Sequence, residues 1–189
     1  MKRIIAISLF ILCVVCLQAQ DLSWDIKFYK GTERETLPIT QIITMETGEI
    51  FQIRISADSD CFSYIITQDP QRRMHVLHDT PLKKDSPLSL GPMQVQEPVG
   101  TETVYVIMGL RKEAKLETAI RNYKSNPASR KHINSLQREI AGLQNRASGL
   151  GEPASTFIPS GGTARSGNQE HTNSFSGKSV YIRTITIFH

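Results

Sequence analysis

Cysteine is scarce in this chain, so disulfide bonds are not expected to stabilise its fold. Only three of the 189 residues are cysteines, and two of these, Cys13 and Cys16, lie in an apolar stretch at the beginning. If that stretch is removed on maturation, only Cys61 is left and no disulfide can form within the chain. Cys61 is followed by aromatic and β-branched residues. We therefore expect a buried, inert thiol, with a reactive or intermolecular thiol as the alternative.

A marked excess of one charge sign is also missing. The chain has 22 Lys and Arg residues against 18 Asp and Glu residues, and loss of Lys2 and Arg3 would leave 20 against 18. Proteins that bind nucleic acids concentrate positive charge on one face, so we expect no nucleic-acid partner. The basic pairs are dispersed and predict solvated surface, with contacts to anionic glycans or lipid headgroups as the alternative. They are Arg72-Arg73, Lys83-Lys84, Arg111-Lys112 and Arg130-Lys131.

No apolar run reaches the ~20 residues that a transmembrane helix requires. The most apolar run, Ile4–Val15, follows the positive pair Lys2-Arg3 and ends shortly before a small residue, Ala19. This order predicts a secretory signal peptide over residues 1–19, cleaved after Ala19 or one residue later. We expect the mature protein to be secreted, in the periplasm or at the cell surface, without a transmembrane span. Lipidation at Cys16 is the alternative.

Residues 20–110 carry the side-chain pattern of β-strands. Apolar and polar residues alternate from Leu22 to Phe28 and again from Phe51 to Ala57, which puts one side of each strand on a core. The segments Cys61–Thr67 and Thr103–Met108 are denser in apolar residues, so we expect them in the middle of a sheet. Short strands separated by turn residues predict a mainly β fold, either an antiparallel β-sandwich or a partly open barrel.

Residues 111–150 change to helix-forming composition and predict a helical hairpin. The first helix, over Arg111–Lys124, should stop at Asn126-Pro127, where Asn126 can serve as N-cap of the second helix and Pro127 as its first residue. In the second helix, apolar residues recur at spacings of three and four. They are Ile133, Leu136, Ile140, Leu143, Ala147 and Leu150. Such a seam predicts packing on the chain's own domain, with a homodimer through its first four members as the alternative.

The last part of the chain divides into two segments. Residues 151–179 are rich in Gly, Ser, Thr, Asn and Pro and predict a flexible polar loop. Residues 180–189 are dominated by β-branched and aromatic side chains. We expect them to form a C-terminal strand that returns to the β-domain, because the alternative leaves an apolar tail in solvent.

Several motifs follow one another between residues 49 and 108. They are the strand Phe51-Gln-Ile-Arg-Ile-Ser-Ala57, the strand Cys61-Phe-Ser-Tyr-Ile-Ile66, the turn Asp69-Pro70, a strand ending Val76-Leu77-His78-Asp79, and Glu97-Pro-Val-Gly-Thr-Glu-Thr-Val-Tyr-Val-Ile107. As an ordered set they resemble the bacterial family called domain of unknown function 4384, over about a third of the chain. The family tends to have a Leu-Phe-Pro-Asn-like corner where this chain has Leu77-His78-Asp79-Thr80. The resemblance implies an accessory β-domain of an exported or surface protein, without catalytic residues of its own.

Motifs that assign a reaction are missing. The chain has no G-x-S-x-G elbow, and its glycine-rich stretch lacks the lysine of a phosphate-binding loop. We therefore predict no catalytic, cofactor-binding or metal-binding residues, and a non-enzymatic interaction or cell-envelope structural module. The alternative is a secreted hydrolase or metal-binding protein whose site would need acidic and histidine side chains to converge in one cleft. The candidates are Asp58, Asp60, His75, His78 and Asp79.

Overall fold

The computed structural model describes residues 22–31, 35–39, 41–148, 172–177 and 180–189. The predicted signal peptide and most of the predicted polar loop lie outside these ranges. The strands are β1 (Leu22–Lys30), β2 (Glu35–Leu37), β3 (Ile43–Thr44), β4 (Ile50–Ala57), β5 (Cys61–Gln68), β6 (Met74–His78), β7 (Pro81–Leu82), β8 (Leu88–Gln94), β9 (Thr101–Gly109), β10 (Asn173–Gly177) and β11 (Val180–Phe188). The helices are α2 (Ala114–Ser125) and α3 (Arg130–Ser148).

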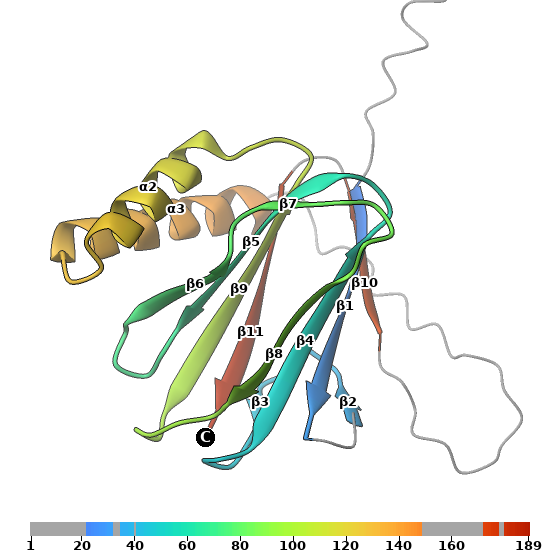
Figure 1. Ribbon diagram of the computed structural model, residues 1–189, viewed down its shortest axis with the longest axis vertical. Helices are drawn as coiled ribbons and strands as arrows, with labels where there is room; N and C mark the ends of the chain where they lie inside the picture. Colours follow the sequence, from blue (N-terminus) through green and yellow to red (C-terminus); the bar gives the residue numbers. More distant parts are fainter. Residues whose placement is uncertain (1–21, 32–34, 40, 149–171, 178–179) are drawn as a thin grey trace, which may run out of the picture.

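The strands form two sheets that share one core (Figure 1). Sheet A has the strand order β10-β1-β4-β8, with β2 also paired to β1. Sheet B has the order β3-β11-β9-β5-β6, with β7 paired to β5. Neighbouring strands are antiparallel except for β11 and β3, which run parallel. The prediction of a mainly β sandwich is confirmed, and the two sheets do not close into a barrel.

The core between the sheets follows from the alternation in the sequence. Successive side chains of a strand point to opposite faces, so every second residue of β1 and β4 is buried. Trp24 stacks on Phe175 of β10 with ring centroids 4.7 Å apart, and Phe28 stacks on Phe51 at 5.2 Å. Each such burial stabilises the fold by about 1.5–3 kcal/mol.

Strands β5 and β9 lie inside sheet B, as the density of apolar residues predicts. Their neighbouring residues face two different cores. Ile65 and Val106 belong to the core between the sheets, whereas Ile66 and Ile107 belong to a second core under the helices. Strand β11 also returns as predicted and pairs with β9 along its whole length. The centre of sheet B is therefore covered on both sides.

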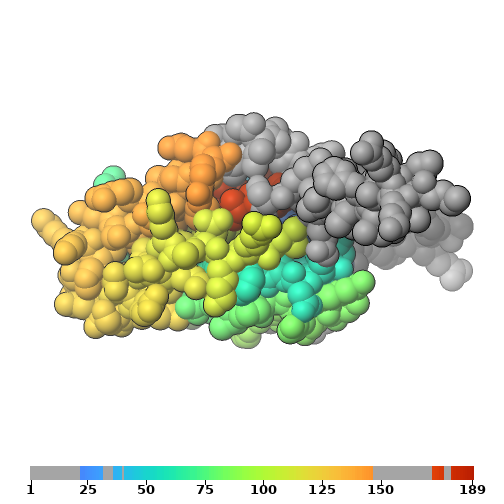
Figure 2. All heavy atoms as spheres, turned by 90° about the horizontal axis from the view of Figure 1, so that it is seen from above, coloured from blue at the N-terminus to red at the C-terminus, as the bar shows by residue number. Residues whose placement is uncertain are grey.

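The helical hairpin supplies the cover for the outer face of sheet B (Figure 1). Seen from above, α2 and α3 form the yellow to orange side of the surface (Figure 2). Leu136, Ile140 and Leu143 are buried there, and Ile133 packs against the same cluster. The seam thus packs on the chain's own sheet, whereas self-association stays a prediction. Within the described ranges, neither helix has the length and apolarity needed to cross a bilayer.

The predicted start of the second helix is wrong. Asn126 does not cap α3, because its N–H donates back to the carbonyls of Asn122 and Tyr123 and so closes α2. Pro127 lies in the turn, and α3 begins only after Ser129, whose carbonyl accepts the N–H of Ile133 at 3.0 Å. These local hydrogen bonds extend α2 to its C-cap, Asn126, and leave Ser129 as the residue before α3.

Candidate functional site

The acidic residues singled out in the sequence are held by other groups. Asp58 lies in the turn between β4 and β5, and Asp60 lies at the end of this turn, directly before β5. Asp58 Oδ1 accepts the N–H of Ser23 at 3.0 Å, and Asp60 Oδ2 accepts a hydrogen bond from Lys83 Nζ at 2.7 Å. Both carboxylates act as turn-stabilising acceptors, which is the ordinary role of aspartate in turns.

The two histidines lie on β6, where they take separate neighbours. His75 Nε2 is 3.9 Å from Asp69 Oδ2, and His78 Nε2 is 3.1 Å from the carbonyl of Thr80. Burial lowers the pKa of His78, although the Thr80 carbonyl opposes this shift. Asp79 is held by a lysine of α2. The structure therefore does not bring the predicted acids and histidines together, and the described residues contain no group of three potential metal-ligating side chains.

Cys61 is a buried free thiol, as predicted. Burial raises its pKa to about 11, with further contributions from the negative charges of Asp60 and Asp58. The thiolate is the nucleophilic form of cysteine. The Cys61 thiol is consequently protonated near neutral pH, which is its weakly nucleophilic form.

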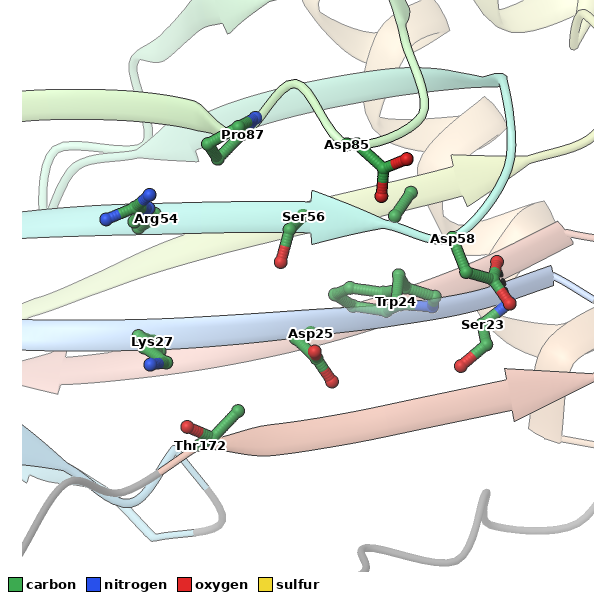
Figure 3. Close-up of a pocket in the computed structure, with 11 residues that line it drawn as sticks. Ser23, Trp24, Asp25, Lys27, Arg54, Ser56, Asp58, Asp85, Pro87 and Thr172 are labelled. Atoms are coloured by element: carbon green, nitrogen blue, oxygen red, sulfur yellow. Dashed lines mark hydrogen bonds between the residues drawn. The ribbon is translucent and has the colours of Figure 1, made fainter.

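A polar groove of about 630 Å³ runs over the outer face of β1 and β4 (Figure 3). Asp25 stands opposite Ser56, and Lys27 stands opposite Arg54 in the strand register. Trp24 borders this groove but is only 2% exposed and turns its ring into the core, so it offers no aromatic face to a ligand there. The described lining residues are Ser23, Trp24, Asp25, Lys27, Arg54, Ser56, Ala57, Asp58, Asp85, Pro87 and Thr172. This mixed-charge surface does not favour one ligand class.

A second groove, called here the β6 groove, has a volume of about 800 Å³ and lies between β6 and the turn that joins α2 to α3. Its lining combines apolar side chains with cations, and none of the described lining residues is acidic. They are Gln71, Arg72, Arg73, Met74, His75, Val76, Leu77, Tyr123, Lys124, Pro127, Ala128 and Ile133.

Two contacts fasten the end of α2 beside β6. The hydroxyl of Tyr123 donates to the carbonyl of Met74. Lys124 Nζ donates to both carboxylate oxygens of Asp79, at 2.9 and 2.8 Å. These contacts hold the end of α2 beside β6 and so shape the groove between them.

The positive end of the groove is built by the turn between β5 and β6. Arg72 adopts a left-handed backbone conformation with φ +64°, which turns the chain sharply before β6 begins. Arg73 is anchored by Asp69, whose carboxylate accepts its backbone N–H at 2.8 Å and its Nε at 2.5 Å. The side chain of Arg72 lines the groove from an exposed position.

Strand β6 presents its main chain to this groove. Among the described strands, only β5 pairs with β6, which lies at the border of sheet B. The carbonyl of Met74 faces away from β5, because Tyr123 donates to it. In an antiparallel ladder the direction of the main-chain groups repeats every second residue, so the N–H and C=O of Val76 also face outward.

The other described sheet borders are less suited to pairing. Strand β8 contains Pro92, which has no N–H to offer an added strand. Strand β3 has only two residues. Strand β10 adjoins segments outside the described residues. Among the described strands, β6 thus combines an outward-facing main-chain edge with an adjoining groove.

Sequence reasoning did not identify this site. It treated Arg72-Arg73 as solvated surface and the histidines of β6 as possible metal ligands. The local signal was a short alternating segment after two arginines, Met74–His78. Its position at the border of a sheet and under a helical turn depends on long-range pairing, which the local pattern does not contain.

Searches of protein-family models and of curated proteins gave no match to this chain. The resemblance of residues 49–108 to the domain of unknown function 4384 family therefore stays a prediction.

Proposed function

We propose that this chain is an exported, non-enzymatic interaction module that binds an extended segment of another protein along the edge of β6 at Val76. The observation that carries the proposal is the coincidence of an unpaired main-chain edge at Val76 with the adjoining β6 groove. Proteins commonly recognise extended segments by adding them as a further strand to a sheet.

The two parts of this site would supply different kinds of binding energy. Each main-chain hydrogen bond with Val76 contributes about 0.5–1.5 kcal/mol net. Apolar groove residues such as Ile133 and Leu77 would bury side chains of the bound strand at roughly 25 cal/mol per Å². The main chain sets the geometry of binding, and the groove sets which side chains are accepted.

Export is supported by the apolar run Ile4–Val15 behind Lys2-Arg3. An interaction module in the cell envelope is consistent with the separate partners of Asp58, Asp60 and His78, which leave no converging catalytic set among them. We place the protein in the periplasm or at the cell surface.

The test is a selection of displayed random peptides on the mature protein, followed by binding to two variants. Val76→Pro removes the outward N–H of β6 without removing a bond to β5. Val76→Ala shortens the same side chain but keeps the N–H, so it controls for lost packing. Peptides that use the edge should bind Val76→Pro at least about tenfold more weakly than Val76→Ala, a difference of about 1.4 kcal/mol.

Thermal unfolding of both variants verifies that the fold is intact before binding is compared. Should Val76→Pro fail to fold, peptides with alternate N-methylated amides provide the same comparison on the wild-type protein, because N-methylation removes donors from the ligand strand. The proposed function is wrong if the selected peptides bind Val76→Pro as tightly as Val76→Ala. It is also wrong if N-methylated peptides bind the wild-type protein as tightly as unmodified ones.

A further inference from the structure

We infer that the segment bound along β6 is acidic, with carboxylate side chains near both ends of the strand. This inference rests on the proposed function and specifies its partner. It follows from the charges that border the β6 groove and from how they are paired.

The cations of the groove are more exposed than the carboxylates that neutralise them. The side chain of Arg73 is 62% exposed, whereas that of its partner Asp69 is 13% exposed. Lys124 is 50% exposed, whereas its partner Asp79 is 28% exposed. Each acid therefore anchors its cation from the protein side. A ligand approaching along β6 meets the cations first.

Unpaired positive charge adds to this field. Arg72 lines the groove, and its guanidinium has no partner among the described side chains. Arg130 and Lys131 are exposed at the start of α3, directly after the turn that lines the groove. Together these residues give one border of the molecule a positive potential, which the small net charge of the whole chain does not indicate.

The cations lie at the two ends of β6. Their positions determine where acidic residues of the bound strand can form ion pairs. Arg72 and Arg73 precede the strand, and Lys124 is bound to Asp79 just after it. Side chains on one face of a strand recur about every 6.6 Å. Acidic residues at both ends of the added strand can thus reach these cations, while the residue between them lies beside Val76 and Ile133.

A second copy of this chain is a poor occupant of the same edge. Pairing β6 with β6 of another copy would bring two sets of the same cations together. Like charges placed opposite each other destabilise strand pairing. The charge pattern therefore favours a heterologous acidic segment over self-association through this edge.

The test uses the peptides recovered from the random display library. Edge-dependent peptides should contain more Asp and Glu than the starting library, and their binding should weaken as salt is added. Arg72→Gln should reduce affinity about threefold and Arg72→Glu at least about tenfold, because the second change reverses the charge. Arg138→Glu is the matched control. Arg138 is an exposed cation of α3 outside the groove lining, so its reversal should leave affinity unchanged.

The outcomes separate this inference from the proposed function. Edge-dependent peptides without an acidic excess would overturn the inference and leave the proposed function standing. Peptides that are insensitive to the Val76 substitutions would overturn the proposed function itself. Binding to vesicles of phosphatidylglycerol is measured as well. If the wild-type protein binds these vesicles, Arg72→Glu does not, and no peptide binds, the positive surface belongs to a lipid-headgroup site and the inference is overturned.

Discussion

Leu136 joins the helical hairpin to sheet B through a fully buried side chain. Leu136→Ala should lower the free energy of unfolding by about 2–5 kcal/mol, because it removes apolar contacts and leaves a cavity. Urea unfolding followed by circular dichroism measures this loss. Arg138→Ala, on the exposed side of the same helix, should change the free energy by less than about 0.5 kcal/mol. Equal effects of the two variants would mean that α3 is not packed on the sheet in solution.

Glu49 makes the stability of the β3–β4 turn dependent on pH. Its carboxylate accepts the N–H of Glu46 at 2.7 Å and lies 2.9 Å from Lys30 Nζ, and both contacts lower its pKa from the ordinary value of glutamate. A carboxylate with a lowered pKa stabilises the fold above its unfolded pKa and loses this contribution as pH falls through the folded value.

Glu49→Gln should therefore be less stable than wild type at about pH 7, and the two should converge only at about pH 2, where the carboxyl is protonated in the folded as well as the unfolded state. Urea unfolding at both values measures the difference. Glu97→Gln, at an exposed glutamate, should match wild type at both. A difference between Glu49→Gln and wild type that is as large in acid as at neutral pH would contradict the ionic origin of the effect.

Among the elements, β11 is the strand that completes sheet B, because it lies between β9 and β3. Deletion of residues 180–189 should abolish cooperative unfolding and cause aggregation. It removes the antiparallel ladder to β9 and the burial of Ile185 and Ile187. Differential scanning calorimetry and the soluble fraction report the result. Phe188→Ala, which shortens a half-exposed side chain at the end of β11, should keep a cooperative transition. A calorimetric transition that survives the deletion unchanged would show that sheet B does not need β11.

The elements could be predicted to the extent that their signals are local. Alternation from Leu22 to Phe28 identifies the buried side of β1, because a strand repeats every two residues. The start of α3 could not be predicted, since Asn126 closes α2 through contacts with the preceding turn. The open border at β6 could not be predicted either. It depends on which strands lie beyond β5, and that is decided by pairings far apart in the chain.

At the scale of the whole molecule, export is the property that the sequence predicts most directly. The native protein should begin near Gln20 or Asp21, since the positive start and apolar run of residues 1–19 favour cleavage there. Mass spectrometry of the protein recovered from its own cell envelope measures the first residue. An acyl group on Cys16 would instead establish the lipoprotein alternative, and an intact Met1 in the cytosol would contradict export.

The pairing of β1 with β10 and of β9 with β11 has a consequence for the order of folding. Leu22 lies opposite Gly177, and Gly109 lies opposite Val180, so each sheet is completed by strands from the last part of the chain. Closing such long loops costs entropy before the ladders form, which slows folding. A chain that has emerged only as far as the hairpin has neither sheet complete. Completion of both sheets therefore depends on the final strands of the chain, β10 and β11.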